Sequence, residues 1–214
     1  WREIARIGAP ASGSNMIGPL ANTMVFAAMA PFGEPAVAGL GVGMRVEALA
    51  LIPLFALSGS IGPITGQNGG AGLDHRVREA FVKSFLFCAG WGFAMAVMLF
   101  VLGRFLAPVF LPSAEGQAVA STYWAIAPFA MGGYGVAMAA AAGFNGLGRP
   151  LIGVACNAFR GVALIIPLAW LGNYLGGANG VIWGLFAANL IAGVVIAFLV
   201  LKFAPLTAKE GGKR

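Results

Sequence analysis

The stretch "GPITGQNGGAGLDHRVREAF", residues 62–81, separates a long apolar segment from the densest cluster of charges in the chain. The residues that precede it, back to Ala48, carry no charged side chain. The last turn of a helix has free carbonyl groups, and Gln67 and Asn68 are suited to satisfy them. The stretch therefore predicts the end of a long apolar helix.

Glycines and an acidic residue complete the predicted turn. Gly69 or Gly70 suits the left-handed backbone conformation that ends many helices. Asp74 is placed to cap the helix that follows, and His75, among the charges, should be solvated. The spacing thus predicts a helix end, a tight turn and a helix start.

The composition of the whole chain extends this pattern. Of the 214 residues, 59% are hydrophobic and 9% are charged, whereas about 25% of the residues of ordinary soluble domains are charged. The mean hydropathy is +0.87. Long apolar segments between short polar joints are typical of a protein whose main solvent is the lipid bilayer. The sequence therefore predicts an all-α membrane protein.

Six segments are long enough to cross a bilayer, which requires about 20 apolar residues per helix. The joints are short, so neighbouring helices should run antiparallel in one bundle over residues 1–203, followed by a basic tail at 204–214. The second span is longer than a membrane requires and should tilt or project beyond the lipid. The predicted spans cover residues 7–30, 36–66, 80–106, 117–143, 151–172 and 179–201.

Basic residues predict the orientation of these spans, because cytoplasmic joints accumulate Lys and Arg. They gather before the first span and after the second, fourth and sixth spans, and these four places share one side. Both termini should therefore be cytoplasmic, with the chain in the inner or plasma membrane.

The composition also excludes several classes of protein. The net charge of +6 does not indicate nucleic-acid binding, because the basic residues lie in joints rather than in one patch. Cys88 and Cys156 lie in apolar segments without a partner motif, so neither a disulfide framework nor a metal site is expected. No nucleotide-binding loop, catalytic triad or pair of catalytic carboxylates appears, so we expect neither an enzyme nor a cofactor.

Glu47 carries the strongest functional signal. If its helix starts near Ala36, Glu47 lies about 16 Å along the axis at ~1.5 Å per residue, close to the middle of the membrane. A carboxylate there costs about 2.5 kcal/mol or more on insertion scales, so it should be paired, protonated or in contact with water. Arg45 is two residues away and lies on a different side of the helix. Glu47 therefore either couples transport to a proton or cation, or pairs with another helix and only holds the bundle together.

Polar and polarisable side chains in two other spans predict a cavity. Asn15 and Asn22 share one face of the first span, which is also kinked by proline, although hydrogen bonds between helices explain them about as well. Met131, Tyr134 and Met138 offer a soft surface that suits apolar cations. Close helix packing is the commoner reason for the small residues around them.

Arg160 lies in the fifth span, and its side chain can be placed in two ways. The apolar stretch that follows, residues 161–172, is short for a full crossing. Arg160 therefore either reaches the inner boundary of the membrane by snorkelling or faces a cavity, and we expect snorkelling.

Three passages carry a family resemblance. The first, "GLGVGMRVEALALIPLFALSGSIGPITGQNGGAGLDHRVREAF" (39–81), has an Arg-x-Glu segment and ends at a Gln-Asn-x-Gly-Ala turn followed by basic residues. The others are "FNGLGRP" (144–150) and "RGVALIIP" (160–167). In these passages, and along nearly its whole length, the chain resembles the multidrug and toxic compound extrusion (MATE) family.

The resemblance implies a fold and a function. Members of the family have twelve helices in two six-helix lobes, and export organic cations or drugs in exchange for H⁺ or Na⁺. This chain would supply one lobe, similar to the C-terminal one, with its partner lobe in the same polypeptide or in a second copy. The family's lobes also place ion-coupling carboxylates on their first helices, but the first span here has no Asp or Glu, which leaves Glu47.

Two alternatives stay open. A lipid-linked oligosaccharide flippase of the same broad superfamily would need basic residues facing the cavity to hold phosphates, for which the sequence offers Arg45. A non-transporting subunit of a membrane assembly would use its polar residues only to bind neighbouring helices.

Overall fold

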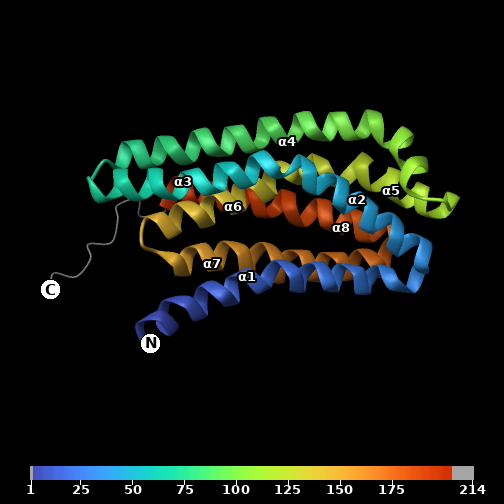
Figure 1. The fold of residues 1–214 in the computed structure, drawn as a ribbon, viewed down its shortest axis with the longest axis horizontal. Helices are drawn as coiled ribbons and strands as arrows, with labels where there is room; N and C mark the ends of the chain where they lie inside the picture. Colours follow the sequence, from blue (N-terminus) through green and yellow to red (C-terminus); the bar gives the residue numbers. More distant parts are fainter. Residues whose placement is uncertain (1, 204–214) are drawn as a thin grey trace.

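The computed structural model describes the backbone of residues 2–203 and the side chains of residues 16–202. In this part of the chain the regular structure is helical throughout, without strands, which confirms the all-α prediction (Figure 1). The predicted tail at 204–214 lies outside the described residues. In chain order the elements are α1 (Arg2–Met29), η1 (Ala30–Phe32), α2 (Glu34–Ala50), α3 (Ile52–Gly70), α4 (Asp74–Phe110), α5 (Ala114–Ile126), η2 (Ala127–Ala130), α6 (Met131–Gly146), α7 (Pro150–Ala158), η3 (Phe159–Ile165) and α8 (Ile166–Phe203).

The helices lie side by side in an elongated bundle (Figure 1). Three helical stretches of the described residues are long and apolar enough to cross a membrane: Asp74–Phe110, Ala114–Gly146 and Pro150–Lys202. Glu34–Ala50 and Ile52–Gly70 make a fourth span if the bent pair counts as one, and Met16–Phe32 is a shorter apolar helix.

The longest of these stretches folds back on itself. Gly176 and Gly177 break α8, and Gly177 has φ 61° and ψ −145°, a conformation that glycine adopts far more readily than other residues. Gly172 and Gly180 bring the two arms together, because a Cβ atom on either glycine would collide with the carbonyl oxygen of the other. The chain thus passes along the bundle six times. The depth of each span in the bilayer stays a prediction.

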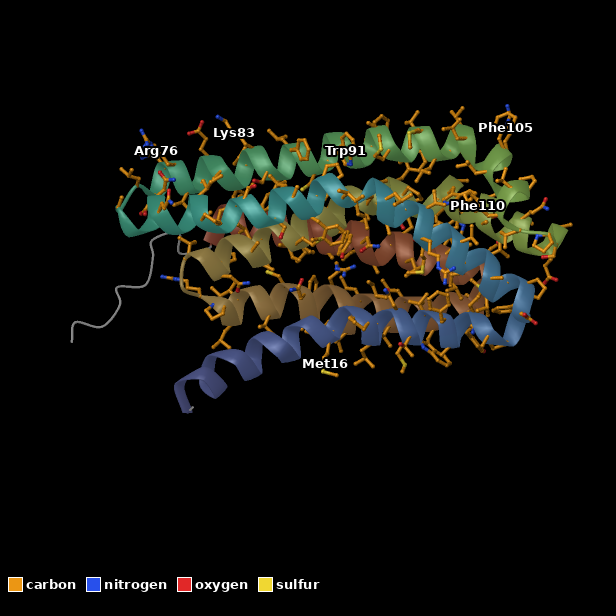
Figure 2. The ribbon with its side chains drawn as sticks, in the orientation of Figure 1. Met16, Arg76, Lys83, Trp91, Phe105 and Phe110 are labelled. Atoms are coloured by element: carbon orange, nitrogen blue, oxygen red, sulfur yellow. The ribbon has the colours of Figure 1, made fainter. Side chains whose placement is uncertain are left out.

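The second pass is bent between α2 and α3 by 49°. Pro53 has no amide hydrogen, and the Leu54 amide donates to the Leu51 carbonyl at 2.9 Å rather than to the Ala50 carbonyl four residues back. The Ala50 carbonyl accepts instead from the indole nitrogen of Trp91 at 2.8 Å, and Figure 2 labels Trp91 on α4. The long second span is therefore accommodated by a bend whose free carbonyl group is satisfied by a side chain.

The predicted turn after this span exists, but a different glycine holds its key position. The Leu73 amide donates to the Asn68 carbonyl at 2.9 Å, and the Gly72 amide donates to the Gly69 carbonyl at 3.1 Å. Gly72 has φ +71°. This is a Schellman motif in which Gly72, rather than Gly69 or Gly70, is left-handed.

The side chains at the turn also differ from the prediction. Asn68 donates through Nδ2 to the Ile64 carbonyl at 2.8 Å, one turn back in the helix. Gln67 contributes its backbone carbonyl, which accepts from the Ala71 amide at 3.1 Å. The prediction that Asp74 caps α4 is wrong, because Leu73 holds the cap position without a side-chain hydrogen bond and Asp74 is already the first helical residue. A carboxylate in a first turn still interacts favourably with the helix dipole.

The left-handed position of Gly72 gives a testable consequence for stability. We expect Gly72→Ala to lower the free energy of unfolding by about 1–2 kcal/mol, the typical cost of left-handed backbone for a residue with a Cβ atom. Gly70→Ala is the matched control, because Gly70 is helical and a Cβ atom there meets nothing within 4 Å. Thermal unfolding of the detergent-solubilised protein measures both, and equal effects of the two changes would contradict the assignment.

Glycines in α6 bring this helix into backbone contact with α3. A Cβ atom on Gly146 would collide with the Gly62 carbonyl oxygen and come 2.7 Å from Thr65 Oγ1. The Thr65 side chain is fully buried, and its hydroxyl lies 2.9 Å from the carbonyl oxygen of Gly143, to which it can donate. The α3–α6 contact is therefore close and hydrogen-bonded, as small residues permit in membrane helices.

Two more glycines of α6 make similar contacts with other helices. A Cβ atom on Gly132 would lie 2.9 Å from the Cys88 carbonyl oxygen of α4, and one on Gly133 would collide with the Asn189 carbonyl oxygen of α8. The small residues of this span thus serve close packing, the commoner of the two explanations weighed from the sequence.

The outer surface of the bundle is apolar between charged ends. Phe93, Phe100 and Phe105 on α4 are each more than half exposed, as expected for side chains that face lipid. Figure 2 shows Phe105 near one end of α4, and Arg76 and Lys83 toward the other. His75 is exposed, as predicted.

Candidate functional site

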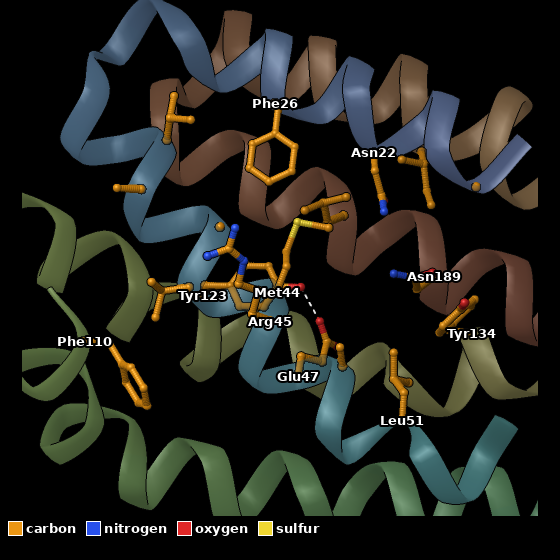
Figure 3. A pocket seen from close by; sticks show the side chains of 18 of the residues that line it. Asn22, Phe26, Met44, Arg45, Glu47, Leu51, Phe110, Tyr123, Tyr134 and Asn189 are labelled. Carbon is orange, nitrogen blue, oxygen red and sulfur yellow. Dashed lines mark hydrogen bonds between the residues drawn. The ribbon is translucent and has the colours of Figure 1, made fainter. Parts of the chain in front are cut away.

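A cavity with a volume of about 880 Å³ lies among the helices (Figure 3). Its size is within the range of about 300–1,000 Å³ that is typical of small-molecule sites. Both polar and aromatic side chains form its wall. They include Asn22, Phe26, Arg45, Glu47, Phe55, Phe110, Tyr123, Tyr134, Arg160 and Asn189.

Glu47 lies on the cavity wall, and its carboxylate accepts a hydrogen bond from the hydroxyl group of Tyr123 (Figure 3). Tyr123, on α5, is 3% exposed. Gly43 allows this approach, because a Cβ atom there would lie 2.8 Å from Cδ1 of the Tyr123 ring. The absence of a side chain at Gly43, one turn before Glu47, thus lets α5 supply the partner of the carboxylate.

Arg45 lines the same cavity from α2 but does not neutralise Glu47. Among the described residues, no ion pair joins Glu47 to Arg45 or to Arg160. This agrees with the expectation that Arg45 and Glu47, two positions apart, point in different directions. The carboxylate therefore faces the cavity with a neutral hydrogen-bond partner.

Arg160 is directed into the cavity, so the prediction that it snorkels to the membrane boundary is wrong. Its guanidinium carbon lies 4.0 Å from the centre of the Tyr134 ring, and Nη1 donates to Oδ1 of Asn189 at 3.1 Å. Arg160 lies in the π-helical turn η3, whose hydrogen bonds join residues five apart instead of four. The aromatic ring and the amide then hold the cation inside the protein.

Only some of the other residues that were predicted to line the cavity do so. Asn22 and Tyr134 line the cavity, whereas the side chain of Asn15 lies outside the described residues. Met131 does not line it, because Met131 is 1% exposed and packed in the core where Gly132 brings α6 against α4. Met138 is half-buried and also lies outside the cavity lining.

Two important residues were missed in the sequence. Tyr123 is a polar aromatic residue in an apolar span, and Asn189 is the amide in the apolar run "LFAANLIAG" of residues 185–193. Intramembrane polar side chains usually face protein or water. Applied to every span, that rule would have selected both residues, but not their partners.

Comparison with known proteins identifies the family. A family model described as MatE matches residues 10–171. The chain belongs to the MatE family. This confirms the predicted fold class, an all-α membrane protein that forms one lobe of a MATE-like fold. The family is one of transporters, not of enzymes.

Two individual relatives match almost the whole chain. It is 34% identical over 199 residues to the FAD transporter of Shewanella oneidensis, covering 93% of this chain and 44% of that protein. It is 34% identical over 205 residues to an uncharacterised 21 kDa protein of Pseudomonas savastanoi, covering 92% and 64% respectively. The chain thus spans less than two thirds of each relative.

A solved structure agrees with this lobe. The crystal structure of a Vibrio cholerae MATE transporter in the bent form superposes with a TM-score of 0.87 at 28% sequence identity. The match covers 93% of this chain and 45% of that one, which is the share expected for one of two similar lobes. The chain is therefore a multi-pass membrane protein of a family that transports small molecules.

Proposed function

We propose that this chain is the C-terminal lobe of a secondary antiporter, which exports aromatic amphipathic molecules in exchange for H⁺ or Na⁺ bound at Glu47. The observation that carries the proposal is the position of the Glu47 carboxylate. It lies on the wall of a cavity of about 880 Å³ and is bonded to a neutral tyrosine rather than to a cation.

This environment suits a group that gains and loses a coupling ion. A carboxylate held away from bulk water is costly when it is unpaired, and the cost disappears when a proton or Na⁺ binds. The Tyr123 hydroxyl donates to the ionised form, so the site does not collapse when it is empty. Rocking against a second lobe would then expose Glu47 to each side of the membrane in turn.

The aromatic side chains support a planar cargo. Phe26, Phe55, Phe110 and Tyr134 all line the cavity, and rings of this kind stack on flat apolar molecules. Organic cations, the cargo expected from the family resemblance, would be attracted by Glu47.

A second candidate cargo is FAD, which the Shewanella oneidensis relative is named for. The specific observation in its favour is that Arg45 and Arg160 line the cavity against one carboxylate, Glu47. Basic side chains hold phosphate groups. The flippase alternative shares this requirement, but the aromatic side chains of the cavity suit a flat ring better than a sugar chain.

The orientation that we propose places both termini on the cytoplasmic side of the inner or plasma membrane. It is supported by the position of basic residues at one end of the bundle. Arg78, near the start of α4, donates to the Leu201 carbonyl at the end of α8 at 2.8 Å. Arg76 and Lys83 lie at the same end of α4 (Figure 2), as the positive-inside rule predicts.

Transport in proteoliposomes tests the proposal. The complete transporter is reconstituted, and the uptake of ethidium, a cationic aromatic dye, and of FAD is followed with and without an imposed pH or Na⁺ gradient. We expect accumulation of one of these molecules against its own gradient when H⁺ or Na⁺ runs in the opposite direction. Accumulation that ignores both gradients would rule out antiport.

A further inference from the structure

Arg160 has a buried hydrogen-bond donor that the protein leaves unused. Its Nη1 atom is engaged by Asn189 at 3.1 Å, and one face of the guanidinium is covered by the Tyr134 ring. The Nε atom is buried without a hydrogen-bond partner. Buried polar groups are satisfied in the great majority of cases, so the guanidinium of Arg160, a residue that lines the cavity, has hydrogen-bonding capacity that the protein does not use.

In the described part of the chain, no carboxylate forms a direct ion pair with Arg160, and Glu47 attracts it only through space. Glu47, the carboxylate on the same cavity wall, accepts from Tyr123 and forms no ion pair with Arg160. An unpaired guanidinium removed from water is unfavourable, and an arriving anion relieves this cost.

The arrangement fixes the geometry that such an anion would meet. Tyr134 and Asn189 hold the guanidinium plane on two sides, so little conformational freedom remains to be lost on binding. A planar guanidinium presents its donors as a fork that matches the oxygens of a phosphate or carboxylate. Arg45 adds a second positive charge on the same wall.

We propose that Arg160 is the anion-binding group of the cavity and recognises a phosphate or carboxylate carried by a soluble molecule with a planar aromatic ring. The ring stacks on Phe26, Phe55 or Phe110, which line the same cavity. This assignment rests on the proposed function in one respect: it takes the cavity to be the cargo site. Of the two cargoes proposed above, it favours anionic aromatic molecules over organic cations.

Equilibrium binding to the complete transporter in phosphatidylcholine nanodiscs tests the assignment. The probes are riboflavin 5′-phosphate and riboflavin, which share one fluorescent ring and differ in the phosphate. We expect the wild type to bind the phosphate at least about tenfold more tightly, since a charge-assisted hydrogen bond is worth about a factor of ten or more. Arg160→Gln should remove that preference, so that it weakens binding of the phosphate by a larger factor than binding of riboflavin.

Two further variants sharpen the result. Arg160→Lys keeps the charge but loses the fork, so an intermediate preference is expected. Arg149→Gln is the matched control, because Arg149 also has a buried Nε atom without a partner but does not line the cavity. It should retain the full preference for the phosphate.

Three outcomes would overturn the assignment. The first is equal binding of both probes by the wild type, a result that needs no variant and therefore decides the question even if Arg160→Gln fails to fold. The second is an Arg160→Gln protein that keeps the full preference for the phosphate. If phosphatidylglycerol added to the nanodisc abolishes binding of riboflavin 5′-phosphate, the site holds a lipid headgroup instead of a soluble cargo.

The experiment also separates this assignment from the proposed antiport. Binding is measured without any gradient and does not depend on the coupling ion. If the wild type prefers the phosphate but shows no gradient-driven transport, only the proposed antiport through Glu47 is contradicted. If the wild type shows antiport but no preference for the phosphate, only the assignment of Arg160 as the anion-binding group is contradicted.

Discussion

Glu47→Gln should reduce gradient-driven transport to the rate measured without a gradient. The amide has nearly the same shape as the carboxylate and its oxygen can still accept from the Tyr123 hydroxyl, so the wall of the cavity should keep its form. The amide does not ionise, so it cannot exchange a proton and offers no negative charge to a sodium ion. The measurement is uptake into proteoliposomes of the complete transporter with an imposed pH or Na⁺ gradient.

Glu34→Gln is the matched control for this change. Glu34 is the first residue of the same helix, is exposed, and does not line the cavity. It should transport like the wild type. A Glu47→Gln protein with full gradient dependence would remove Glu47 from the mechanism, whereas thermal unfolding at the wild-type temperature would show that loss of transport is not loss of fold.

Gly146→Ala should have the largest effect on stability among the changes considered. The new methyl group would collide with the Gly62 carbonyl oxygen and crowd the hydroxyl of Thr65, which hydrogen-bonds across to α6. Overpacking of a close contact typically costs about 1–3 kcal/mol, and backbone atoms have less freedom to yield than side chains. We expect a lower unfolding temperature and less monodisperse protein in detergent.

Gly90→Ala provides the comparison for this prediction. Gly90 lies in α4, and a Cβ atom there meets nothing within 4 Å. Alanine is the better helix former, so this change should be neutral or slightly stabilising. If Gly146→Ala and Gly90→Ala unfold at the same temperature, α3 and α6 do not touch as described.

The number of passes through the bundle followed from the sequence because it depends on lengths. An apolar run of about 20 residues must cross a membrane whatever its neighbours are. Local turn geometry was less accessible: the chain offers several glycines after Asn68, and only the hydrogen bonds of Leu73 and Gly72 select the left-handed one. Hydrophobicity does not distinguish among them.

The candidate site was predictable to the extent that it depends on the cost of burying charge. Glu47 was selected because a carboxylate at that depth must face water or a partner. Its partner Tyr123 is distant in the chain, so pairing required the three-dimensional structure. Arg160 was misplaced because its depth was inferred from the length of the apolar run that follows it, residues 161–172, and that length does not show that Tyr134 and Asn189 lie beside it.

The glycine contacts of α6 have a mechanical consequence. Three neighbouring helices meet its backbone through Gly146, Gly132 and Gly133, with no long side chains between them that could slide or change rotamer. Such close backbone contacts are stiff, so α6 and the helices around it should move together as one rigid body. When the lobe changes conformation, bending would then occur mainly at the two breaks in the helical backbone, near Leu51 and Gly177, which would act as hinges.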